Sequence, residues 1–194
     1  MTEAASVVTE SRFEQGVKSF NEWLDIIDIR EDQFQRNYDE YQPEENNLNQ
    51  LQELVNEHGI KALVIGEAWC PDVWRGLPVI AKLSEATGMQ ARYFIKDDNQ
   101  DIMSEFLNGE FESIPTVVFY DKDMNYIFHW IERPQEANEE MAVLRDKFLQ
   151  GVPSEGEERD AAMRAFRVEV AKRSDHWRHL TLFEIVESLK KHLT

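Results

Sequence analysis

The residues best suited to chemistry lie in one short stretch, positions 67–74, which read EAWCPDVW. Cys70 is the only cysteine among 194 residues, and it follows an apolar run and precedes a proline. If Cys70 is the N-cap of a helix with Pro71 at its first position, the sulfur faces unpaired backbone N–H groups and the positive end of the helix dipole. That placement lowers a thiol pKa and favours the nucleophilic thiolate. Asp72 opposes the effect, because a carboxylate in the same turn repels a thiolate, and the sequence leaves the balance open.

Other side chains near Cys70 have two interpretations each. Glu67 is a candidate proton acceptor for the thiol, although an ordinary loop carboxylate is the favoured interpretation. Trp69 is suited to shaping an exposed apolar contact surface, whereas Trp74 is expected in the core. Arg75 could bind an anion or offset Asp72, but a solvated arginine is favoured.

The elements that must position Cys70 can be predicted from the hydrophobic spacing. Four strands are predicted, at residues 62–65, 91–95, 116–120 and 126–131. The first is a continuous apolar run, as in a strand covered on both faces, and a helix follows it to a stop at Gly88. The last two form a hairpin, and further helices are predicted over 102–107 and beyond Pro134. This order of elements is that of an α/β protein.

Helices are predicted on both sides of this central pattern. An amphipathic helix is expected over 11–29, with Ser11 and Glu14 as its capping box. Near the C-terminus, Ser154 with Glu157 and Thr181 with Glu184 predict the starts of two separate helices. The resulting division is a flexible N-terminus at 1–10, a helical extension at 11–58, a core at 59–150 and a C-terminal helical extension, packed on the core, at 151–194.

Composition and charge exclude several classes of function. With 38 acidic and 21 basic side chains the formal charge is −17, so nucleic acid and membrane surfaces are not expected partners. No run approaches the roughly 20 apolar residues that span a bilayer, and no secretory signal is recognisable, so a cytoplasmic location is expected. No cofactor motif is present, and His176 and His179 lack a third ligand, so no metal or cofactor is predicted.

Two motifs together resemble the thioredoxin superfamily: Trp69-Cys70-Pro71-Asp72 between a strand and a helix, and Ile114-Pro115 just before a later strand. The similarity spans roughly residues 60–150. The spacing of ALVIGEAWCPD, LPVIAKLSEA, SIPTVVFYDKD and Arg133-Pro134 is similar to a bacterial thioredoxin-like subfamily with extra terminal helices. The resemblance implies a central mixed sheet flanked by helices. It also implies that Ile114-Pro115 is a cis bond in a loop beside Cys70 that presents the Ile114 backbone to an extended peptide. An ordinary trans proline at the start of a strand is the alternative.

Val73 departs from the family pattern, because it stands where a dithiol thioredoxin has its resolving cysteine. A mixed disulfide at Cys70 could then be reduced only by an external thiol. The leading hypothesis is therefore monothiol thiol–disulfide redox chemistry, with a low-molecular-weight thiol or a protein thiol as partner. The alternative is a non-catalytic thioredoxin-fold interaction module in which Cys70 is a structural relic. In that case the helical extensions cover the fold or supply a dimer or partner surface, and the sequence leaves the oligomeric state open.

Overall fold

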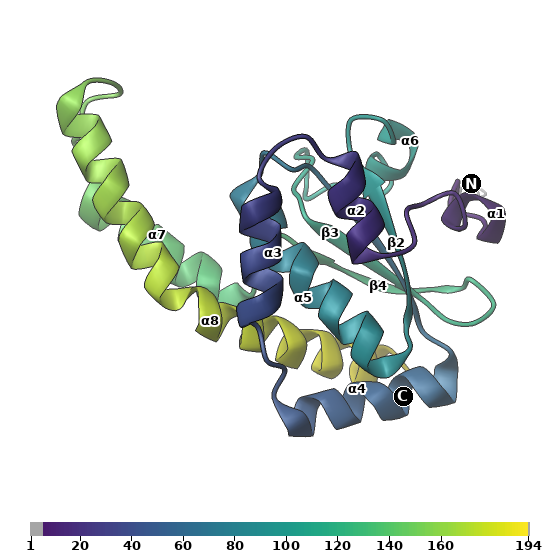
Figure 1. The fold of residues 1–194 in the computed structure, drawn as a ribbon. Coiled ribbons are helices and arrows are strands. Elements are labelled where there is room, and N and C mark those ends of the chain that lie inside the picture. Colours follow the sequence, from purple (N-terminus) through teal and green to yellow (C-terminus); the bar gives the residue numbers. More distant parts are fainter. Residues whose placement is uncertain (1–5, 194) are drawn as a thin grey trace.

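A four-stranded mixed sheet forms the centre of the computed structural model, which describes residues 6–193 (Figure 1). The strands are β1 (Lys61–Gly66), β2 (Gln90–Ile95), β3 (Thr116–Tyr120) and β4 (Tyr126–Ile131). Their order is β2-β1-β3-β4; β1 and β2 are parallel, and the other two pairs are antiparallel. Every residue of β1 and β3 is buried, as expected for central strands with continuous apolar runs. The fold is α/β, as the pattern predicts.

Helices surround this sheet and also extend beyond it. They are α1 (Glu10–Phe13), α2 (Phe20–Ile26), α3 (Glu31–Glu40), α4 (Glu45–His58), α5 (Pro71–Thr87), α6 (Gln100–Met103), α7 (Gln135–Leu149) and α8 (Glu157–Leu193). Helix α5 contacts β1 and β2, and it also packs against α3, α4 and α8. None of the helices in residues 6–193 is long and apolar enough to cross a membrane.

The helix predicted over residues 11–29 is wrong, because two short helices and an extended linker occupy this region. Val17 forms a β-bridge with Tyr93, so the linker adds backbone pairing to the edge strand β2. Gly16 makes this approach possible, since a Cβ there would lie 2.5 Å from the ring of Phe94. The predicted Ser11 cap is also wrong: Thr9 caps α1, and Ser19 caps α2. Apolar side chains of this region still pack into the core, but the Val17 backbone pairs with the edge of the sheet instead of making helical hydrogen bonds.

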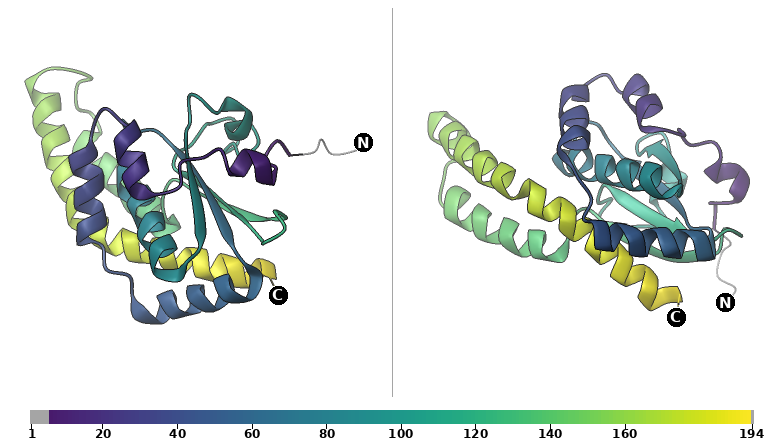
Figure 2. Two further views of the ribbon diagram at one scale, coloured as in Figure 1. Left: turned by 45° about the vertical axis from the view of Figure 1, so that its right-hand side comes forward. Right: turned by 60° about the horizontal axis from the view of Figure 1, so that its bottom comes forward.

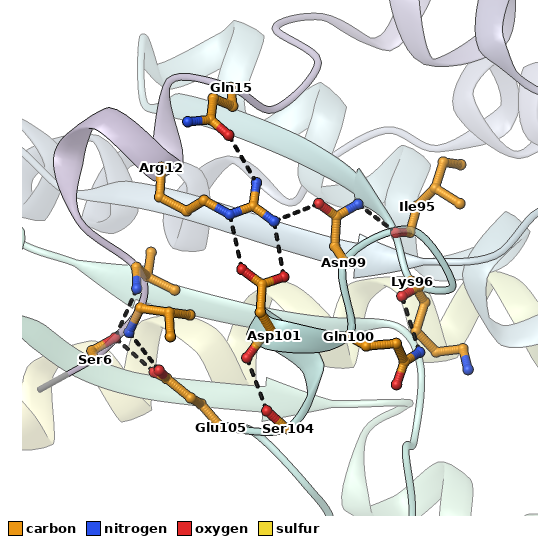
Figure 3. Close-up of polar contacts among 12 residues, drawn as sticks. Ser6, Arg12, Gln15, Ile95, Lys96, Asn99, Gln100, Asp101, Ser104 and Glu105 are labelled. Carbon is orange, nitrogen blue, oxygen red and sulfur yellow. Dashed lines mark hydrogen bonds and ion pairs between the residues drawn. The ribbon is translucent and has the colours of Figure 1, made fainter. Parts of the chain in front are cut away.

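A polar network holds the N-terminal segment against α6 (Figure 3). The Arg12 guanidinium donates to both Asp101 oxygens, at 3.1 and 3.0 Å, and to Asn99 Oδ1 at 2.7 Å. Ser6 Oγ donates to Glu105 at 2.6 Å, so residues 6–10 are anchored. Residues 1–5, the remainder of the segment predicted to be flexible, lie outside the described residues.

Helix α6 is shorter than the helix predicted over 102–107. It ends at Met103, and turns follow. Ser104 Oγ donates to the carbonyl of Asp101, and such a side-chain hydrogen bond competes with the helical pattern.

The C-terminal region is one continuous helix, α8, so the predicted break before Thr181 is wrong. The Thr181 hydroxyl donates to the Trp177 carbonyl one turn earlier, and Glu184 accepts from the Trp130 indole and the Gln135 N–H. Both residues of the expected capping box therefore make contacts that tie α8 to neighbouring turns and elements. The C-terminal half of α8 contributes four residues to the main core, Leu182, Ile185, Val186 and Leu189.

Helix α7 and the N-terminal half of α8 form a hairpin that projects away from the sheet (Figures 1 and 2). The hairpin has a small core of its own, formed by Ala137, Met141, Leu144, Val170 and Trp177. One side of this hairpin faces the N-terminal ends of α3 and α5.

Arg178 joins α8 to α3 and is only 5% exposed. Its Nη1 donates to Asn37 Oδ1 at 2.9 Å, and Glu40 and Asp175 lie at 3.6 and 3.2 Å. Arg178→Ala should lower the free energy of unfolding by about 1.5–3 kcal/mol, since a buried hydrogen bond to a charged group is lost. Urea denaturation measures the effect. The control is Arg173→Ala on the more exposed side of α8, expected to cost less than about 1 kcal/mol; equal losses for the two variants would contradict this role of Arg178.

Candidate functional site

Cys70 is the N-cap residue of α5, with Pro71 at the start of the helix. β1 ends at Gly66, and the connection is tight because the Cys70 N–H donates to the Glu67 carbonyl at 3.1 Å. The Cys70 carbonyl then accepts from the Val73 and Trp74 N–H groups. The strand–turn–helix sequence thus places the thiol at the N-terminus of a long, buried helix.

Two glycines allow α5 to lie close to its neighbours. A Cβ on Gly66 would lie 2.7 Å from the Val73 side chain, and a Cβ on Gly76 would lie 3.1 Å from Pro115 Cγ. The Ile114–Pro115 peptide bond is cis. Cys70 Sγ lies 3.7 Å from the Ile114 carbonyl oxygen and donates to it. Residues 114–115 therefore lie directly opposite the thiol.

Burial dominates the electrostatics of the thiol. Cys70 is 9% exposed, and its burial raises the pKa of the thiol above the ordinary value. The backbone N–H groups of Val73 and Asp72 lower this pKa, while the negative charges of Asp72 and Glu132 raise it further. The balance that the sequence left open thus favours the protonated thiol at neutral pH.

Asp72 is held in an ion-pair cluster beside Cys70. Arg133 Nη2 lies 2.9 Å from one Asp72 oxygen, and Arg75 Nη1 lies 3.5 Å from the other. The Arg75 guanidinium also covers the Trp74 ring at 4.8 Å. Arg75 is therefore neither a simple solvated side chain nor a free anion site. Arg133 was not predicted as a neighbour of the cysteine, because it follows β4, some 60 residues later in the chain.

A groove opens beside this cluster between α3, α5 and the α7–α8 hairpin, with a volume of about 590 Å³. Its floor and walls include Trp69, Trp74, Met141, Met163 and Phe166. Trp69 is 56% exposed, and its role in an apolar contact surface stays a prediction; Trp74 is half-buried against the core. Four arginines and a single carboxylate, that of Asp72, also line the groove.

A family model described as Thioredoxin matches residues 17–147. This chain belongs to the thioredoxin family. The match extends beyond the predicted core at its N-terminal side, and it includes both the cysteine motif and the proline loop. A comparison with curated proteins found no significant match.

Two solved structures have the same thioredoxin-like fold. One is a protein of unknown function from Pseudomonas aeruginosa, 19% identical, with a TM-score of 0.66 over 97% of this chain and 99% of the other. The second is an HIV epitope-scaffold, 18% identical, with a TM-score of 0.66 over 96% of this chain and 99% of the other. The high coverage means that the terminal helices are part of the shared fold. The predicted thioredoxin-like α/β fold with terminal helices is confirmed.

Two other residues considered in the sequence analysis, Glu67 and His176, form polar contacts with residues other than Cys70 in this thioredoxin-family structure. The Glu67 carboxylate is 8% exposed and accepts from the Asp97 N–H at 2.8 Å; burial raises its pKa and this hydrogen bond lowers it. Its role as a proton acceptor stays a prediction. His176 lies 2.9 Å from Glu136, and residues 6–193 contain no group of three or more potential metal ligands.

Sequence reasoning missed the side of the site formed by the helical hairpin. Arg145, Met163, Phe166 and Arg167 line the same groove as Trp69 and Asp72 only because the α7–α8 hairpin lies beside the start of α5. The one available signal was the presence of Arg145 and Arg167 in a strongly acidic chain, and this signal does not indicate where the two side chains lie in the fold.

Proposed function

We propose that this thioredoxin-like protein performs monothiol thiol–disulfide exchange through Cys70. The observation that carries the proposal is the position of Cys70 Sγ, at the N-terminus of α5 and 3.7 Å from the Ile114 carbonyl. This position combines backbone N–H groups that stabilise a thiolate with an adjacent loop and an exposed tryptophan that can contact a partner. The proposed setting is a reducing cytoplasm, where external thiols are abundant.

The reaction needs two exchange steps. In the first, the Cys70 thiolate attacks one sulfur of a partner disulfide, forming a mixed disulfide and releasing the other sulfur as a thiolate that takes up a proton. In the second, an external thiolate attacks the partner's sulfur, forms a new disulfide with it and releases Cys70. Val73 supplies no thiol for this step, so the external thiol must be a low-molecular-weight or protein thiol.

The raised pKa of Cys70 sets the speed of both steps. At neutral pH only a small fraction of the thiol is ionised, so the attack is slow. A thiol of high pKa is also a poor leaving group, so a mixed disulfide at Cys70 is long-lived when the attack must expel Cys70. The site is therefore suited to holding a partner covalently more than to rapid turnover.

The test is mixed-disulfide formation with oxidised glutathione, followed by intact-protein mass spectrometry between pH 6 and about 10. We expect one adduct per wild-type chain and none on Cys70→Ser. The rate should rise with pH and level off only above the ordinary cysteine pKa, because the thiolate is the attacking species. An adduct that forms on urea-unfolded protein but at no pH on the folded protein would refute the proposal.

A second candidate function is a non-catalytic interaction module, favoured by the burial of the thiol, which raises its pKa and keeps it protonated at neutral pH. In this case Cys70→Ser would keep the fold and every partner interaction of the wild-type chain. If the wild-type chain captures a partner covalently and Cys70→Ser does not, while both have the same thermal unfolding curve, the redox function is supported over the module.

A further inference from the structure

The groove beside Cys70 carries positive charge in a chain whose formal charge is −17. Its lining includes Arg30, Arg75, Arg145 and Arg167 but only one carboxylate, Asp72. Asp72 is already paired with Arg75 and Arg133. The groove is therefore a local exception to the charge of the molecule.

Three of these arginines have no acidic partner within residues 6–193: the side chains of Arg30, Arg145 and Arg167 make no hydrogen bond or ion pair there. All three are exposed, and they come from three different elements, the start of α3, α7 and α8. A small anion at any one of them would be in contact with solvent and a single guanidinium. A longer ligand that runs along the groove can pair with several arginines at once.

Apart from Gln33, the remaining side chains of the lining are apolar. Trp69 and Phe166 offer aromatic faces, while Met141 and Met163 are flexible side chains that adapt to different shapes. Trp69, Pro71 and Asp72 all line the groove, so one end of it lies at the start of α5, next to the turn that carries Cys70. An occupant that satisfies this lining needs carboxylates and at least one large apolar side chain.

We propose that the groove binds an acidic peptide segment of a protein partner, with carboxylates on Arg30, Arg145 and Arg167 and an apolar side chain against Trp69 and Phe166. The inference deepens the proposed function and rests on it, because it names the class of protein whose sulfur is brought to Cys70. Charge complementarity then selects partners, and the thiol captures those that carry a disulfide within reach.

Binding is tested without the covalent step by using full-length Cys70→Ser. Fluorescence anisotropy is measured with a fluorescein-labelled synthetic peptide of alternating glutamate and leucine and with a matched peptide in which lysine replaces glutamate. We expect saturable binding of the acidic peptide, at least about tenfold tighter than the lysine peptide, and weakened by added salt.

The variants locate the binding site. Arg145→Glu/Arg167→Glu should weaken the acidic peptide at least about tenfold, because attraction becomes repulsion at two positions. Arg164→Glu is the matched control: it lies on α8, is exposed and does not line the groove, so its affinity should change less than about twofold. If the double variant fails to fold, the peptide preference and its salt dependence still decide the question.

Three results would overturn the inference: equal binding of the two peptides, no loss in the double variant, or an equal loss in Arg164→Glu. If sedimentation experiments detect a dimer of the Cys70→Ser chain that the double variant no longer forms, the groove is assigned to a second copy of the chain instead. The two proposals fail separately. Peptide binding with an inert Cys70 refutes only the redox function, and a reactive Cys70 without acidic-peptide preference refutes only the groove.

Discussion

Val73→Cys is expected to turn this chain into a dithiol protein that reduces protein disulfides catalytically. Val73 lies three residues after Cys70 in the first turn of α5, and residues at this spacing in a helix have Cα atoms about 5 Å apart. That separation lies within the roughly 4.4–6.8 Å that a disulfide spans between Cα atoms. The new thiol would attack a mixed disulfide at Cys70 within the chain, at an effective concentration of the order of millimolar or higher. Turnover of insulin with dithiothreitol should rise at least about tenfold above the wild-type rate.

The substitution is compatible with the packing around position 73. Val73 is fully buried against Gly66, and cysteine is slightly smaller, so the expected cost is about 1 kcal/mol of stability. Val73→Ser is the control, because it alters the same site without adding a thiol. If Val73→Cys forms the internal disulfide yet reduces insulin no faster than Val73→Ser, the surface around Cys70 does not accept protein disulfides.

Asp72→Asn should make Cys70 markedly more reactive at neutral pH. The carboxylate raises the pKa of the thiol through its negative charge, and its removal also leaves Arg75 and Arg133 without their counter-ion. Both changes favour the thiolate, so the thiol pKa should fall and alkylation at pH 7 should be about tenfold faster. The pH profile of the iodoacetamide reaction measures this shift directly.

Glu132→Gln is the graded control for this prediction. Glu132 also raises the pKa of Cys70, but it contributes less than Asp72, so its removal should give a smaller downward shift. Thermal unfolding of each variant shows whether the fold persists. A pKa that stays unchanged or rises in Asp72→Asn would mean that the Asp72 carboxylate does not hold the thiol in its protonated form.

The elements that could be predicted from the sequence are those with a local cause. The continuous apolar run at 62–65 became β1, and Gly88 ends α5 in the left-handed conformation that glycine tolerates. The failures occurred where tertiary contacts replaced local ones. Val17 left the predicted helix to pair with Tyr93, and Thr181 remained inside α8. An amphipathic pattern and a capping motif describe what a segment can do alone, and neither records a neighbouring sheet edge or a second helix.

The candidate site divides in the same way. Cys70-Pro71 after a strand determined an N-cap cysteine at the start of a helix, and with Ile114-Pro115 it indicated the thioredoxin family, because these features depend on residues adjacent in sequence. Only the tertiary structure decided that the thiol is buried and its pKa raised, since desolvation depends on everything that covers the sulfur. The same holds for the pairing of Asp72 with Arg133 and for the basic groove, whose residues come from distant helices that meet only in the folded chain.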